Sequence, residues 1–290
     1  MKVGIEMKKK TRKNLAGTLV YHFLVLLVGL MMIYPLVWML MSSFKPTETV
    51  MNTAGQLIPQ QFTLVNYSNG WRGFSDTSFL VFFRNTILTT LLATVGVLVT
   101  TPMVAYGLAR LRFGLRNALF VIVLGTMLLP EQVMMIPQYL WYNKLGWINT
   151  YYPLIVPHWF AVSGFYVYLM MNFIGGIPRD LDEAAKIDGC SYYAIYSRII
   201  LPLLSPAVAT VAIFSFLGRW NDYMGPLLYI RRTKNYTVSL ALKLFCDTTA
   251  KSDYGALFAM STLSLLPIFL IFVTMQKYLT QGVVTSGLKG

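Results

Sequence analysis

The chain has 290 residues, of which 56% are hydrophobic and only 12% are charged. A soluble domain carries about 25% charged residues, so this composition excludes an ordinary soluble protein and predicts an all-α integral membrane protein with room for about six spans. The net charge of +13 does not indicate a nucleic-acid-binding protein, because six of the 24 basic residues lie within the first 13 residues and not on a folded basic face.

The N-terminal part of the chain is predicted to hold a tail, one span and one loop. Residues 1–16 form a basic tail that should stay in the cytoplasm. No charged residue occurs from 14 to 44, and residues 17–44 are predicted as the first transmembrane helix, too long for a secretory signal peptide. Residues 45–80 are rich in Pro, Gly, Asn, Thr and Ser without helical periodicity, which predicts an irregular extracytoplasmic loop.

Residues 81–278 are predicted to form a core of five further spans, followed by a cytoplasmic tail at 279–290. The uncharged runs that define them are 85–109, 117–139, 145–178, 199–218 and 254–276. The second of these runs is interrupted by Pro130, Glu131 and Pro137. The 110–116 loop carries three arginines and no acid, which places it with the N-terminus in the cytoplasm.

One connection conflicts with this orientation. Residues 226–253 should lie outside by the span count, yet they contain Arg231, Arg232, Lys234, Lys243 and Lys251. The assignment is kept because the N-terminal tail and the first loop usually dominate orientation. Six spans then return the C-terminus to the cytoplasm.

A polar loop at 178–202 separates two apolar runs. Four of the eleven acidic residues fall between Asp180 and Asp188. Asp180 or Asp182 can cap a helix N-terminus, the alanines that follow are strong helix formers, and Gly189 allows a turn before a second helix at 191–201. The loop is therefore predicted to be a structured cytoplasmic element. It either merely connects two spans or carries force into them from a partner protein.

The residue spacing in this loop resembles a family signature. Glu183-Ala184-Ala185, then Gly189, then Ile199, Leu201 and Pro202 match the E-A-A pattern of permease subunits of bacterial binding-protein-dependent ABC importers. Other motifs resemble the carbohydrate branch of that family, and the last two of them resemble the second permease chain of the maltose-transporter type. They are Ser43-Phe44-Lys45-Pro46, Leu57-Ile58-Pro59, Phe62-Thr63-Leu64-Val65-Asn66-Tyr67, Phe83-Arg84-Asn85-Thr86, Trp220-Asn221-Asp222-Tyr223 and Gly287-Leu288-Lys289-Gly290.

The resemblance implies a specific assembly. The chain is expected to have the ABC type I importer permease fold, with six transmembrane helices and both termini in the cytoplasm of a bacterial inner membrane. It would pair with a second homologous permease chain, two ATPase subunits that bind ATP and Mg, and an extracytoplasmic sugar-binding protein. The 178–202 loop would be the coupling helix that transmits ATPase motion while a di- or oligosaccharide is translocated. The coupling residues are expected to be Asp182, Glu183, Ala184, Ala185, Asp188, Gly189, Ile199, Leu201 and Pro202.

An enzyme is not predicted. The chain has no G-x-x-x-x-G-K-[ST] loop to cradle ATP phosphates, so ATP is not expected to bind to it, and no other cofactor is expected. It also has no Ser-His-Asp arrangement for nucleophilic catalysis. His22 and His158 lie on different spans and are too few for a metal site. A self-sufficient secondary transporter would need an ion-coupling site and, typically, inverted repeats, and neither is visible. A glycerol phosphate permease would need several inward cations, more than Arg84 and Arg219 supply.

The substrate pathway is predicted from polar and aromatic residues near the spans, because sugars need planar donors and acceptors together with aromatic faces. Ionisable groups within a membrane are functional candidates by default. Glu131 has an alternative interpretation, in which it pairs with a basic residue or sits at the outer end of its span. Arg219 and Asp222 could form only a helix-surface pair. The partner chain could also supply most of the sugar contacts. The candidates are Glu131, Gln132, Gln138, Tyr139, Asn143, Trp220, Asn221 and Asp222.

Overall fold

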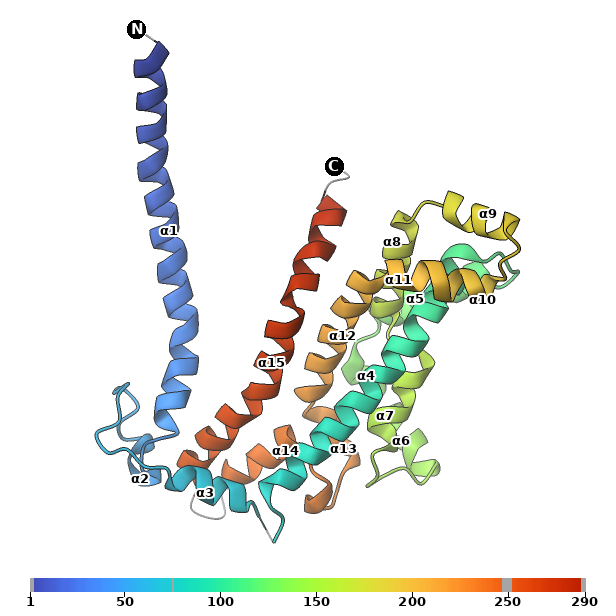
Figure 1. The fold of residues 1–290 in the computed structure, drawn as a ribbon. Coiled ribbons are helices and arrows are strands. Elements are labelled where there is room, and N and C mark those ends of the chain that lie inside the picture. The colour runs from blue at the N-terminus through green and yellow to red at the C-terminus, as the bar shows by residue number, and fades with distance from the viewer. Residues whose placement is uncertain (1–2, 75, 247–251, 288–290) are drawn as a thin grey trace. The chain divides into compact units, whose positions relative to one another are not determined.

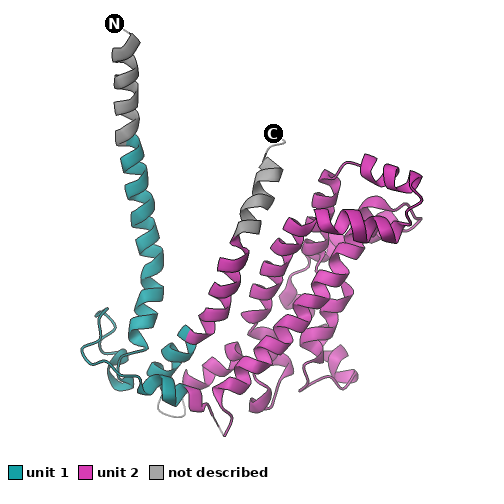
Figure 2. Ribbon diagram, in the orientation of Figure 1, with its two compact units in different colours: residues 1–70, 248–262 teal, residues 71–247, 263–290 magenta. Residues whose placement is uncertain are grey.

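The computed structural model describes residues 3–74, 76–246 and 252–287. Over these residues the chain is helical, apart from turns, loops and one isolated bridge between Phe74 and Thr77. It divides into two compact units, residues 1–70 with 248–262 and residues 71–247 with 263–290 (Figure 2). Lys251 and residues 288–290 of the predicted C-terminal motif lie outside the described residues.

Four helical stretches among the described residues are long and apolar enough to cross a membrane. They are Gly17–Ser42 within α1 (Val3–Ser42), α4 (Phe79–Arg110), Tyr152–Gly176, and Tyr254–Gln276 within α15 (Tyr254–Gly287). Two bent helix pairs raise the number to six if each pair makes one crossing. The all-α membrane class is therefore confirmed. Within the predicted tails, residues 3–16 belong to helix α1, which begins at Val3, and residues 279–287 belong to helix α15, which ends at Gly287.

In the first unit, the predicted irregular loop at 45–80 contains two short helices, α2 (Thr47–Val50) and α3 (Val65–Arg72). Lys45 is only 2% exposed, and its Nζ donates to the carbonyls of Thr53 at 2.8 Å and Gln56 at 2.5 Å. This burial lowers the pKa of Lys45. The amide of Asn66 in turn donates to the carbonyls of Ser43 and Lys45. Two of the sequence motifs thus fold this loop by bonding to each other.

In the second unit, α4 is the central helix. It packs against α8 (Gly164–Gly176), α12 (Ser205–Trp220) and the 3-10 turn η1 (Val156–Phe160), which follows α7 (Tyr152–Ile155), as Figure 1 shows. Its buried face is lined with threonines and small residues, and such residues let helices approach closely in a membrane. These buried threonines are Thr86, Thr89, Thr90, Thr94 and Thr101.

Prolines break two of the predicted spans. α5 (Arg116–Leu128) and α6 (Glu131–Lys144) meet at an angle of 106°, because Pro130 holds Leu129 in an extended conformation. The predicted interruption of the 117–139 run at Pro130 and Glu131 thus corresponds to this bend. The second break, of 74°, lies at Leu204 just before Pro206. Within the predicted run at 199–218, the straight helix α12 therefore begins at Ser205, and the residues before it belong to the other arm of the bend.

The connection after α12 is also structured. It contains α13 (Met224–Tyr229), η3 (Thr233–Asn235), α14 (Val238–Leu242) and η4 (Lys243–Cys246). Asn85 at the start of α4 donates from Nδ2 to the carbonyls of Lys234 at 3.0 Å and Tyr236 at 2.9 Å. Thr86 Oγ1 accepts a hydrogen bond from the backbone of Val238 at 2.8 Å. The Phe83–Thr86 motif thus fastens this connection to α4.

Candidate functional site

The 178–202 loop folds into a two-faced helix followed by a second helical stretch. The first helix, α9 (Asp180–Ile187), has three acidic residues in its first turn, where they favour the positive end of the helix dipole. Asp182 and Ala185 are 8% and 6% exposed and face the neighbouring spans. Glu183 and Ala184 are exposed on the opposite side. The outer face of α9 is therefore uncovered in the isolated chain.

Gly189 ends α9 in a Schellman motif. Its φ of +82° lies in the left-handed region, which favours glycine. Its N–H donates to the carbonyl of Lys186 at 3.0 Å, and the N–H of Cys190 donates to the carbonyl of Ala185 at 2.9 Å. These are the two bonds that define the motif. Asp188, the residue before the glycine, is exposed. The glycine of the signature is thus explained by backbone geometry.

The second half of the loop contains α10 (Tyr192–Ile195), a π-helical turn η2 (Tyr196–Ile200) and α11 (Leu201–Leu203). In the π turn the N–H of Leu201 donates to the carbonyl of Tyr196, five residues back. Pro202 follows directly, and a proline cannot donate to the carbonyl four residues before it. Ile199 and Leu201 pack partly buried against the core, whereas Pro202 is exposed.

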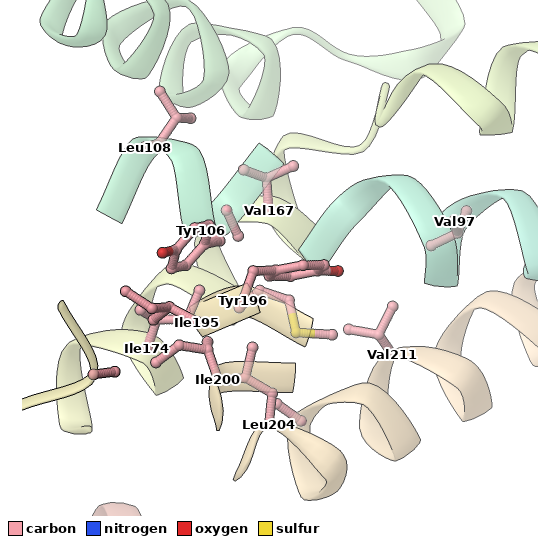
Figure 3. Close-up of a cluster of buried hydrophobic side chains, with 14 residues drawn as sticks. Val97, Tyr106, Leu108, Val167, Ile174, Ile195, Tyr196, Ile200, Leu204 and Val211 are labelled. Carbon is pink, nitrogen blue, oxygen red and sulfur yellow. The ribbon is translucent and has the colours of Figure 1, made fainter. Parts of the chain in front are cut away.

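A cluster of buried apolar side chains joins this loop to the spans (Figure 3). Ile195, Tyr196 and Ile200 from the loop pack with residues of α4, α8 and α12. The inner face of the loop is therefore part of the core of the second unit. The cluster comprises Val97, Ala105, Tyr106, Leu108, Val167, Met170, Ile174, Ala185, Ile195, Tyr196, Ile200, Leu204, Ala207 and Val211.

A hollow of about 430 Å³ lies beside α9. It is lined by the end of α4, the following loop and the first residues of α9. Lys186 lies over the ring of Tyr192, with 5.2 Å from Nζ to the ring centroid. The lining residues are Arg110, Leu111, Arg112, Phe113, Arg179, Asp182, Glu183, Lys186 and Tyr192.

A second cavity, of about 420 Å³, opens among α6, α8, α12 and α13. This volume is within the usual range of about 300–1,000 Å³ for ligand pockets. Its wall mixes aromatic rings with polar groups, and the hydroxyl of Ser215 in the wall is buried without a hydrogen-bond partner. The polar and tyrosine side chains that line it are Thr126, Glu131, Gln138, Tyr142, His158, Ser163, Tyr166, Ser215, Arg219, Asp222 and Tyr229.

Arg219 is the positively charged arginine in the wall of this cavity. Its Nη1 lies 3.1 Å from Nε2 of His158 and 4.0 Å from Oδ2 of Asp222. A guanidinium can only donate, so His158 Nε2 accepts this hydrogen bond. Asp222 Oδ1 also accepts from the backbone N–H of Gly225 at 3.0 Å. Arg219 thus contacts His158 of η1 and Asp222 in the connection between α12 and α13.

Tyr229 forms the aromatic part of the same wall. It contacts Tyr142 edge-on, with 5.3 Å between ring centroids. Burial, with the nearby Tyr142, Asp222 and Glu131, raises the pKa of Tyr229 to about 12. At neutral pH the phenol therefore stays protonated and can donate a hydrogen bond.

The predicted pathway residues separate into two groups. Glu131, Gln138 and Asp222 line the cavity. Gln132, Tyr139, Asn143, Trp220 and Asn221 do not belong to its wall. Trp220 is buried, and its Nε1 donates to the carbonyl of Ser264 at 3.1 Å, while Tyr139 accepts from Arg231. Trp220 is therefore held in the core by a hydrogen bond from its indole N–H.

Sequence reasoning missed several residues of this wall. His158 was considered only as a metal ligand, yet it lies against Arg219, 61 residues later in the chain. Nothing in the sequence distinguishes Tyr142, Tyr166 and Tyr229 among the 18 tyrosines of the chain. Their shared position is created by the bend at Pro130 and by the fold around α4. Among the described residues, no group of three His, Cys, Asp or Glu side chains could hold a metal ion.

Comparisons with known proteins agree with this architecture. Residues 102–285 match the family described as binding-protein-dependent transport system inner membrane component, and the chain belongs to this family. It is 32% identical over 289 residues to the Bacillus subtilis protein named probable ABC transporter permease protein YurM, covering 99% of this chain and 94% of that protein. It is 31% identical to the arabinooligosaccharides transport system permease protein AraQ of Halalkalibacterium halodurans, covering 98% and 100% of the two chains.

A solved structure shows the same fold. A chain from the crystal structure of a bacterial ABC transporter involved in the import of the acidic polysaccharide alginate matches with a TM-score of 0.78. The identity is 24%, and the match covers 90% of this chain and 95% of the other. The chain therefore has the fold of an ABC importer permease, and it is an inner membrane component.

Proposed function

We propose that this chain is the permease subunit of an ATP-binding-cassette importer that translocates a sugar, a di- or oligosaccharide, delivered by an extracytoplasmic solute-binding protein. The observation that carries the proposal is the two-faced helix α9. Its inner face is packed into the spans, while Glu183 and Ala184 are exposed. The name of the arabinooligosaccharide permease, a relative over nearly the whole chain, supports a sugar as the cargo.

The outer face of α9 is proposed to bind an ATPase subunit. Glu183, Ala184, Asp188 and Gly189 are exposed there and can touch a partner. Asp182, Ala185, Ile199 and Leu201 lie on the inner side and would position this surface. The complete importer would contain a second homologous permease chain and two ATPase subunits, which bind ATP and Mg.

The proposed topology has six crossings and both termini in the cytoplasm. Counting each bent helix pair as one crossing supports this number. The three arginines at 110–116 and the basic N-terminal segment support the orientation. The 178–202 loop would then lie in the cytoplasm, where it can meet an ATPase, and residues 45–80 would lie outside.

The cavity at α6 and α12 is proposed as part of the substrate pathway. Tyrosine rings and planar polar groups suit a sugar. The wall contains one arginine, Arg219, and two carboxylates, Glu131 and Asp222. This balance favours a neutral sugar over glycerol phosphate, because a phosphate needs several cations or aligned donors.

The proposal is tested with the intact complex. The chain is co-expressed with a second permease chain, the ATPase and the binding protein of its importer, and the complex is reconstituted in proteoliposomes. ATP hydrolysis is measured with maltotriose, arabinotriose and glycerol 3-phosphate, each with the binding protein. A neutral oligosaccharide should stimulate hydrolysis and be taken up. Stimulation by glycerol 3-phosphate alone would contradict the sugar assignment, and ATP-independent uptake by the chain alone would indicate a secondary transporter.

A further inference from the structure

The 178–202 loop is joined by the chain itself to α8 and α12, but side chains also join it to α4. Arg110 is the last residue of α4, and its side chain is only 6% exposed. Its Nη2 donates to the carbonyls of Ile174 at 3.0 Å and Ile177 at 2.6 Å. These carbonyls belong to the C-terminal end of α8, where backbone acceptors lack helical partners and a cation is favoured.

The same guanidinium reaches into α9. Arg110 Nε lies 3.1 Å from Oδ2 of Asp182, whose side chain is 11% exposed. Asp182 belongs to the first turn of α9. Its neighbours Asp180 and Glu183 are exposed, so only the inward carboxylate of this turn takes part. One side chain of α4 therefore binds both the end of α8 and the start of α9.

Tyr106 supplies a second link from the same face of α4. It lies one helical turn before Arg110, and residues four apart lie on one side of a helix. Its hydroxyl donates to the carbonyl of Tyr192 at 3.3 Å, and its ring lies 5.3 Å from that of Tyr196. The two residues together hold both helical halves of the loop against α4.

We propose that Arg110 and Asp182 form a latch through which movement of the 178–202 loop is passed to α4. The proposal rests on the proposed function, because an ATPase must supply the movement. Without the latch, α9 would be held only by the short segment 177–179, which can bend, by the packing of Ala185 in the core cluster and by the chain that follows α9. Arg110 Nε and Asp182 Oδ2 form a buried ion pair by their distance of 3.1 Å, without the geometry of a hydrogen bond, and separating the two groups would leave two buried charges unpaired. Since α4 packs against α8 and α12, the latch makes the central helix of the unit move with α9. Asp182 is thus a positioning residue.

Three substitutions of the same helix turn test the latch. Asp182→Asn removes the charge and nearly keeps the shape, Asp182→Glu restores the charge, and Asp180→Asn removes an exposed charge as the matched control. Each full-length chain is assembled in the complex, and uptake is measured per ATP hydrolysed, with maltotriose or arabinotriose, whichever stimulates the wild-type ATPase. Asp182→Asn should lower uptake per ATP at least fivefold, Asp182→Glu should recover part of it, and Asp180→Asn should match the wild type.

A second measurement needs no ATPase. Trypsin can cut the full chain in nanodiscs after Lys186, which is exposed, and cutting at this bond is compared because neither Asp180 nor Asp182 adjoins it. Asp182→Asn should be cut at least fivefold faster than wild type, and Asp180→Asn at the wild-type rate. Unchanged cutting overturns the latch. Faster cutting with unchanged uptake per ATP overturns the transmission role and leaves only a structural bond. A wild-type complex without ATP-driven uptake contradicts the proposed function instead, and the trypsin comparison still decides whether the latch exists.

Discussion

Gly189 offers a graded test of how the 178–202 loop holds its shape. Its φ is +82°, and a residue with a side chain costs about 1–2 kcal/mol in the left-handed region. A Cβ placed on Gly189 meets no atom within 4 Å. The cost of Gly189→Ala is therefore purely conformational. We expect Gly189→Ala to destabilise the ATPase-bound loop by about 1 kcal/mol, which is roughly fivefold in affinity.

Proline and asparagine at the same position bracket this effect. Proline fixes φ near −65° and removes the N–H that Gly189 donates to Lys186 at 3.0 Å. Gly189→Pro should therefore cost at least about 3 kcal/mol, roughly 100-fold in affinity. Asparagine tolerates the left-handed region better than alanine, so Gly189→Asn should lie between wild type and Gly189→Ala.

The assay is a titration of the ATPase against the two permease chains in nanodiscs. Gly175→Ala is the matched control, since Gly175 lies within α8 without a positive φ and its Cβ would also meet no atom within 4 Å. It should leave the affinity unchanged. Wild-type affinity in Gly189→Ala, or equal losses in Gly189→Ala and Gly189→Pro, would refute the reasoning that the left-handed turn positions the binding surface.

Three further outcomes are expected. The purified chain without an ATPase partner should hydrolyse ATP only at background rates, because it has no phosphate-binding loop; turnover by the pure chain would contradict the subunit assignment. Glu183→Lys should abolish ATPase co-purification while Asp180→Lys keeps it, because loss of the favourable dipole contact alone is worth only about 0.3–1 kcal/mol; equal behaviour of the two variants would remove the special role of Glu183. Topology can be tested with single cysteines in a chain whose native cysteines are replaced by serine, at Ile58 and Ile187, which are 74% and 87% exposed. An impermeant maleimide should label Ile58→Cys in intact spheroplasts, and Ile187→Cys only after permeabilisation. Labelling of both in intact spheroplasts would contradict the topology.

The helices of this protein could largely be predicted from its sequence, because long uncharged runs have one main explanation in a membrane protein. α4 ends one residue beyond the predicted run 85–109, and α15 begins at the predicted Tyr254, although it continues to Gly287. The bends within the spans were harder to predict from the sequence. Pro137 lies inside α6 without ending it, whereas Pro130 turns the chain by 106°. A proline in the sequence marks a missing donor, but surrounding packing decides whether the helix continues.

In the candidate sites too, the features that depend on local sequence were predictable and those that depend on packing between distant segments were not. The spacing of Glu183 and Gly189 depends on local helix geometry, so the signature pointed to the correct turn. The inward position of Asp182 could not be deduced, because it depends on Arg110, 72 residues earlier and on another helix. Trp220 was assigned to the pathway for its chemistry, and only the structure reveals its bond to Ser264. Contacts between distant segments are therefore what the sequence alone did not disclose.

The π turn at Tyr196–Ile200 has a consequence for the length of the chain between α9 and α12. A π turn holds one residue more than an α-helical turn, and each residue of an α-helix turns the chain by about 100°. Deleting one residue there would restore the ordinary helix and rotate everything before it relative to α12. The outer face of α9 would then point in another direction although none of its own residues had changed. The number of residues in this segment would therefore set the direction of the proposed docking face, independently of which side chains form that face.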